Sequence, residues 1–84
     1  MGFWDKEQEL AKVEKKGTKS SFYSFKLVSK NGREMVDVRE HFEKIDGTIQ
    51  HTAKGMSIPL NTFTDMMVAF RDVNEELRDK LESL

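Results

Sequence analysis

Cationic and aromatic side chains recur along one stretch of the chain, and together they could bind a nucleic-acid strand. The stretch runs from Phe22 to His41 and includes Lys26 and Arg39. Lysine and arginine neutralise phosphates, and aromatic rings stack on bases that are not paired. No glycine-rich phosphate loop, nucleophile elbow or kinase signature accompanies them. We therefore expect a binding protein rather than an enzyme.

The remaining reactive residue types do not form a metal or redox centre. The chain has no cysteine, which removes thiolate ligands, thiol nucleophiles and disulfides. His41 and His51 are ten residues apart, without a third ligand at a spacing typical of zinc. Asp37 and Glu40 fall on opposite faces of one strand and cannot work as a paired acid and base. We expect no catalytic residues, no metal and no cofactor.

The pair Asn31-Gly32 predicts a hairpin that positions the cations and rings. Asn-Gly favours a two-residue turn, and residues 35–42 alternate as a half-buried strand does. With this turn Lys30 faces Arg33. One face of the hairpin, expected to be solvated, then carries Phe22, Ser24, Lys26, Arg39 and His41, and the other, expected to be core, carries Tyr23, Phe25, Leu27, Val36 and Val38. An ordinary hairpin whose outer face is only solvated, without a binding role, would show the same pattern.

Further strands are expected on both sides of this hairpin. Residues 9–16 have helix-favouring composition, but a strand there would cover the open edge of the hairpin, and we predict a strand. Residues 1–8 are interpreted as an arm, in which Trp4 is a local anchor or a stacking ring. Residues 43–54 are turn-rich, and a short strand over 56–58 ends at Pro59, so that the sheet occupies residues 9–60.

Residues 61–84 are predicted to form one amphipathic helix, capped by Asn61 or Thr62, with Asp65 in its first turn. A helix of ~20 residues is ~30 Å long, more than so small a sheet covers. We therefore expect part of its apolar stripe to contact a second copy, although it could lie wholly on its own sheet. The expected dimer interface comprises Phe63, Met66, Met67, Phe70, Val73 and Leu77.

Charge is unevenly distributed along this 84-residue chain of net charge −1, which we interpret as one domain. Seven cations and one anion lie between residues 12 and 33, whereas three cations and six anions follow residue 54. Opposite electrostatic faces are therefore expected. No apolar run approaches the length of a membrane helix and no signal peptide is recognisable. We expect no membrane partner and an intracellular protein of the nucleoid, nucleus or cytoplasm.

The order of two strand motifs and a helix resembles the positive cofactor four family of single-stranded-DNA-binding transcriptional coactivators. The motifs are Met35-Val36-Asp37-Val38-Arg39-Glu40-His41-Phe42 and Lys54-Gly55-Met56-Ser57-Ile58, and the resemblance runs from about Ser20 to Leu77. It implies an α+β fold in which a four-stranded antiparallel curved sheet is followed by a C-terminal helix. It also implies that two copies dimerise through this helix.

Site residues follow from the resemblance combined with the hairpin. Arg39 corresponds to a family arginine on the DNA face, Lys54 to the lysine before a strand glycine, and Phe42 to a frequent tryptophan. Human-type members of the family carry an arginine near the position of Val28 and an aromatic residue near that of Lys30. Lys26 and Phe22, on the same face, compensate for these two differences. The predicted nucleic-acid-binding residues are Phe22, Lys26, Lys30, Arg33, Arg39, His41, Phe42 and Lys54.

These observations lead to one expected function and one alternative. The first is largely sequence-independent binding of single-stranded DNA, in transcription regulation or in DNA replication or recombination, with RNA left open as a ligand. The alternative is a dimeric adaptor that docks a polymerase or a transcription factor. Only phosphate binding should weaken steeply with salt.

Overall fold

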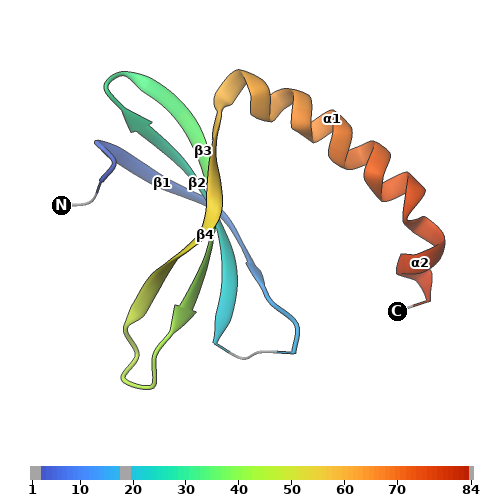
Figure 1. Ribbon diagram of the computed structural model, residues 1–84, viewed down its shortest axis with the longest axis horizontal. Coiled ribbons are helices and arrows are strands. Elements are labelled where there is room, and N and C mark those ends of the chain that lie inside the picture. Colours follow the sequence, from blue (N-terminus) through green and yellow to red (C-terminus); the bar gives the residue numbers. More distant parts are fainter. Residues whose placement is uncertain (1–2, 18–19, 84) are drawn as a thin grey trace.

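The computed structural model describes residues 3–17 and 20–83, apart from the side chain of His51 (Figure 1). It is an antiparallel sheet followed by helices, which confirms the α+β class. The strands, in spatial order β1-β2-β3-β4, are β1 (Lys6–Glu14), β2 (Ser21–Lys30), β3 (Arg33–Glu43) and β4 (Ile49–Pro59). The helices are α1 (Leu60–Glu76) and α2 (Arg78–Glu82). Thr18, Lys19 and Leu84, which fall in the predicted loop and stripe, lie outside the described residues.

The β2–β3 hairpin has the predicted register. Lys30 pairs with Arg33, and Phe22 pairs with His41 at the other end of the ladder. Asn31 and Gly32 both have positive φ, at 54° and 79°. Two consecutive residues of positive φ match the right-handed twist of the strands they connect, which is why Asn-Gly is favoured here.

The edge strands are longer or shifted relative to the prediction. β1 pairs with β2 as expected but begins at Lys6, inside the predicted arm. An extra residue at Leu10 shifts the register between Glu9 and Ala11. β4 spans residues 49–59, so the prediction of turns over 43–54 was wrong for its second half. The long edge of β3 supplies hydrogen-bonding partners that override the weak strand propensity of this polar segment.

Three predictions about the helix were wrong. The N-cap is Pro59 rather than Asn61 or Thr62, and Asp65 lies beyond the first turn. The proline ring fixes φ near the value that a helix needs, so the chain turns from strand to helix without a side-chain cap. The helix is also interrupted at Leu77 (φ −94°, ψ 2°), although no proline or glycine marks the break. No helix in the described part of the chain is long and apolar enough to cross a membrane.

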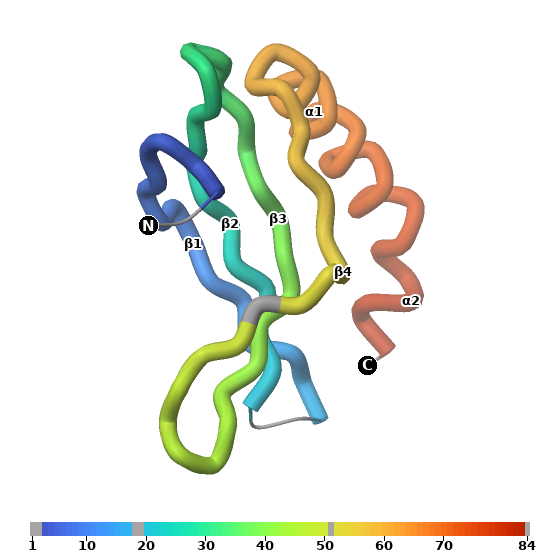
Figure 2. The backbone as a smooth tube through the Cα atoms, turned by 60° about the vertical axis from the view of Figure 1, so that its left-hand side comes forward, coloured from blue at the N-terminus to red at the C-terminus, as the bar shows by residue number. Residues whose placement is uncertain are grey.

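Helix α1 leaves the end of β4 on one side of the sheet and extends away from it, and none of its residues is buried (Figures 1 and 2). Of the residues predicted to form the core on this face, Val36 is buried, Tyr23 is exposed, and Phe25, Leu27 and Val38 are half-buried. The prediction of a core position was wrong for Tyr23, because α1 covers only part of the face.

Candidate nucleic-acid interface

The face of the sheet opposite α1, here called the polar face, holds most of the predicted binding residues. α1 defines the other face, because its Phe63, Met67 and Phe70 line an apolar pocket with Phe25 and Val36. Strand alternation therefore directs to the polar face Phe22, Ser24 and Lys26 from β2 and Asp37, Arg39 and His41 from β3. The face was expected to be solvated, but Ser24, Asp37 and His41 are buried. Residues of β1 and of the segment before it line pockets together with them.

An aromatic stack lies at one end of the polar face. The rings of Phe22 and His41, which pair across β2 and β3, have centroids 5.4 Å apart and planes inclined by 22°. Lys12 Nζ lies 4.6 Å from the centroid of the Phe22 ring, a favourable position for a cation over a π system. Because His41 is only 3% exposed, Phe22 offers the more accessible ring of the two.

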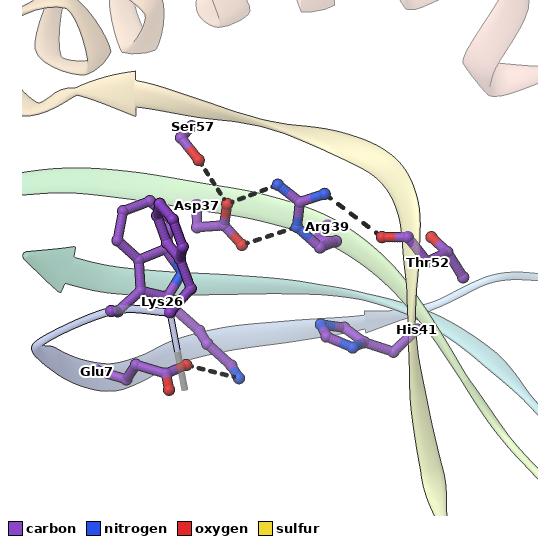
Figure 3. A pocket seen from close by; sticks show the side chains of 9 residues that line it. Glu7, Lys26, Asp37, Arg39, His41, Thr52 and Ser57 are labelled. Atoms are coloured by element: carbon purple, nitrogen blue, oxygen red, sulfur yellow. Dashed lines mark hydrogen bonds and ion pairs between the residues drawn. The ribbon is translucent and has the colours of Figure 1, made fainter. Parts of the chain in front are cut away.

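Arg39 lies beside this stack and forms a two-pronged ion pair with Asp37 of the same strand (Figure 3). Arg39 Nε donates to Asp37 Oδ2 at 3.2 Å, and Arg39 Nη2 donates to Asp37 Oδ1 at 3.0 Å. Ser57 Oγ of β4 also donates to Asp37 Oδ1, at 2.7 Å. The remaining terminal nitrogen, Nη1, makes only a long contact of 3.4 Å with the carbonyl oxygen of Thr52. The guanidinium is thus oriented by Asp37 and keeps donor capacity.

The ion pair fixes the charge state of both side chains. Burial alone would raise the pKa of Asp37, but the hydrogen bonds from Arg39 and Ser57 and the positive charge of Arg39 outweigh it and hold that pKa below its ordinary value. The hydrogen bond to the Asp37 carboxylate in turn raises the pKa of Arg39. Both groups are therefore charged throughout the neutral range.

The other cations of the polar face are held by fewer or weaker interactions than Arg39. Lys26 Nζ is 3.3 Å from Glu7 Oε1, and both side chains are partly exposed (Figure 3). Lys30 Nζ donates to the carbonyl oxygen of Phe3 at 2.8 Å and lies over its ring, while Arg33 is exposed at the turn. Among the described residues, no carboxylate lies within ion-pair distance of Lys12. The face therefore offers ammonium groups that can exchange partners.

Two predicted binding residues are not brought to this face. Lys54 Nζ is 4.0 Å from Glu40 Oε1, and Lys15 Nζ is 3.1 Å from Glu40 Oε2. Glu40 pairs with Tyr23 and so lies on the face that α1 covers. Phe42 follows the same alternation and lines a hollow at the β3–β4 turn with Ile45.

Some residues of the polar face were not predicted as binding residues. Glu7, Thr52 and Ser57 line a pocket of about 480 Å³ together with Lys26, Arg39 and Trp4, for which a stacking role was one of two expectations. The position of Ser57 opposite Asp37 required the β3–β4 register, which the predicted short strand did not supply. Lys12 could have been found from the alternation of β1, but the extra residue at Leu10 changes which residues share a face. Among the described residues, no group of three potential metal ligands occurs.

Comparison with known families identifies the class of protein to which this sheet and helix belong. The family described as Transcriptional Coactivator p15 (PC4) matches residues 18–69, more than half of the 84-residue chain. The match covers β2, β3, β4 and the first part of α1. The chain therefore belongs to the p15 (PC4) family, as the sequence motifs indicated; this is a family of nucleic-acid-binding coactivators and not a known enzyme family. Comparison with curated proteins and with solved structures gave no significant match.

Proposed function

We propose that this protein binds single-stranded DNA along the polar face and acts in transcription. One observation carries the proposal: Lys12, Lys26 and Arg39 surround the Phe22–His41 stack on the side of the sheet that α1 leaves uncovered. Family membership supports both the ligand class and the process. The proposal extends to roles in replication or recombination and to RNA as a ligand of the same surface.

Binding would proceed by exchange of ion-pair partners. The Lys26 ammonium group can leave Glu7 for a phosphate, since the lysine–glutamate pair is partly exposed and such pairs contribute little stability. Arg39 need not leave Asp37, because Nη1 is directed only to a long contact with Thr52. Phosphates bound in this way release counterions, so affinity should fall steeply as salt rises and depend little on sequence.

The rings would favour a single strand over a duplex. Stacking on Phe22 requires a base whose face is exposed, and bases in a duplex are already stacked on one another. Each base stacked on an aromatic ring contributes ~1–3 kcal/mol. A strand that crosses Lys12, Phe22 and Lys26 would therefore combine phosphate contacts with at least one stacking contact.

The apolar stripe of α1 supports a homodimer as part of the proposal. Met67, Phe70, Val73 and Leu77 are each more than 40% exposed, and Phe63 and Met66 are half-buried. A contiguous exposed apolar surface of this kind is typical of a protein interface. A second copy bound along α1 would cover the stripe and place two polar faces in one particle. Analytical ultracentrifugation should then give twice the chain mass, and a monomer at micromolar concentration would contradict this part.

Fluorescence anisotropy of a labelled ~20-nucleotide oligo-dT strand tests the main proposal, with the matching duplex as control. We expect tight binding to the single strand, weaker binding to the duplex, and a linear fall of log affinity with log salt. No binding to the single strand at low salt would contradict the proposal.

A docking role is the second candidate. It is favoured by the pairing of Lys26 and Arg39 with carboxylates, which lowers the net positive charge of the polar face. Acidic residues on α1 and α2 would then contact a basic protein partner. Absence of DNA binding combined with a stable dimer would favour this candidate.

A further inference from the structure

The segment before β1 is held against the polar face by interactions on both sides of Trp4. The amide of Asp5 donates to the carbonyl oxygen of Ser29 at 2.8 Å, and the amide of Asn31 donates to Asp5 Oδ2 at 2.9 Å. On the other side, Lys30 holds the carbonyl oxygen of Phe3. The neighbours of Trp4 are therefore fixed to the β2–β3 turn, which limits the positions that the indole can adopt.

The indole of Trp4 forms part of the wall of the 480 Å³ pocket of the polar face. It is half-buried and meets the Phe3 ring edge to face, with centroids 4.8 Å apart. Lys26, Arg39 and Ser57 belong to the same pocket (Figure 3). The aromatic ring of Trp4 thus lines one pocket with two cations, two carboxylates that pair with them, and two hydroxyl groups.

These groups are suited to one nucleotide rather than to an apolar ligand. A pocket of this volume falls within the range of small-ligand sites, and an indole is a platform on which any base can stack. Arg39 or Lys26 can hold the attached phosphate, and Thr52 and Ser57 offer oxygen atoms toward the edge of a base. The occupant that fits this combination is an unpaired base of a nucleic-acid strand.

We infer that Trp4 is a base-stacking residue, and that its pocket is a second base site beside the Phe22–His41 stack. The inference rests on the proposed function and adds a residue to it. Trp4 lies outside residues 18–69, the segment that the family matches, so the match itself assigns no role to this residue. A nucleic-acid strand that contacts the rings of both Trp4 and Phe22 would pass Lys26, which lines both pockets.

Intrinsic fluorescence gives a direct test, because Trp4 is the only tryptophan in the chain. The full-length protein is titrated with unlabelled oligo-dT under excitation selective for tryptophan, while anisotropy of a labelled strand reports binding in parallel. We expect the indole emission to be quenched in proportion to the bound fraction, as base stacking requires. Binding without any change in emission would overturn the inference and leave the proposed function intact.

Two variants and a matched control measure the contribution of the ring. Trp4→Ala should lower single-strand affinity by about five- to a hundredfold, and Trp4→Phe should restore most of it. Tyr23→Leu, which removes a partly exposed ring from the opposite face, should change affinity less than twofold. Because stacking involves no counterion release, Trp4→Ala should leave the slope of log affinity against log salt unchanged.

The alternative outcomes are distinguishable. Tighter binding by Trp4→Ala would show that the indole covers the site, and would overturn the inference. Unchanged affinity with a normal salt slope would do so as well. Absence of binding by the unmodified protein would instead contradict the proposed function itself. Thermal unfolding of each variant shows whether a loss of affinity reflects a loss of fold.

Discussion

The two faces of the sheet differ in which side chains they bury. On the polar face, Ser24, Asp37 and His41 are at most 4% exposed, and the Lys26–Glu7 ion pair links β2 to β1. On the face toward α1, Leu10, Val13 and Met56 are at least 51% exposed although they are apolar. The single chain therefore buries polar side chains on the polar face and leaves apolar side chains exposed on the face toward α1. This difference agrees with the proposal of a second copy on the apolar side and a ligand on the polar side.

Substitution of Gly55 should have the largest effect, because both faces depend on the pairing of β3 with β4. A Cβ atom at Gly55 would lie 2.5 Å from the carbonyl oxygen of Val38 and 2.8 Å from the Cα atom of Arg39. Both obstacles are backbone atoms, so the strands would have to separate. Gly55→Ala should lower the free energy of unfolding by about 3 kcal/mol, measured by urea denaturation.

Gly47 provides the matched control for this prediction. It has a positive φ of 89°, but a Cβ atom added there would have no neighbouring atom within 4 Å, so Gly47→Ala meets only backbone strain. Its cost should be about 1 kcal/mol. Equal losses for the two variants would contradict the close approach of β4 to Arg39.

Asp37→Ala should change stability and binding in opposite directions. It removes the partner of Arg39 and of the Ser57 hydroxyl, and the free energy of unfolding should fall by about 2 kcal/mol at neutral pH. The same change deletes a negative charge from the polar face and releases the guanidinium for phosphate. Single-strand affinity should therefore rise several-fold in anisotropy, and a fall in a folded variant would contradict the assignment of this face.

The pH dependence of stability sharpens this prediction. The pKa of Asp37 in the folded protein lies below its ordinary value of 3.8, so the folded state favours the ionised form. The resulting stabilisation is complete above about pH 5 and is lost as pH falls through 3.8 toward the folded pKa. The stability difference between the unmodified protein and Asp37→Ala should therefore shrink in acid, and a difference independent of pH would contradict it.

The sequence predicted the hairpin well because its signals are local. Asn31-Gly32 determines the turn, and the alternation that follows determines which of Phe22, Lys26 and Arg39 share a face. What could not be predicted depends on contacts between distant segments. The extent of β4 depends on the edge of β3, and the position of Trp4 depends on hydrogen bonds to the β2–β3 turn. Lys54 could not be placed, because β4 has an irregular register between its pairings with Arg39 and His41.

Lys54→Ala should have the smallest effect and is best compared with Lys26→Ala. Lys26 lies in both pockets of the polar face, and its loss should weaken single-strand binding several-fold and reduce the salt slope by about 0.7. Lys54 is 80% exposed and is directed to Glu40 on the face toward α1. Its removal should change affinity less than twofold, with anisotropy measured at the same two salt concentrations.

The outcome for Lys54 decides whether DNA contacts one face or both. A phosphate near Lys54 would also approach the buried carboxylate of Glu40, whose negative charge opposes it. Lys54 and Lys15 together compensate that carboxylate, so the local charge available to a strand is smaller than on the polar face. If Lys54→Ala nevertheless weakened binding as much as Lys26→Ala, the bound DNA strand would have to pass around the edge of the sheet at β4. The polar face would then be one part of a longer path rather than the whole site.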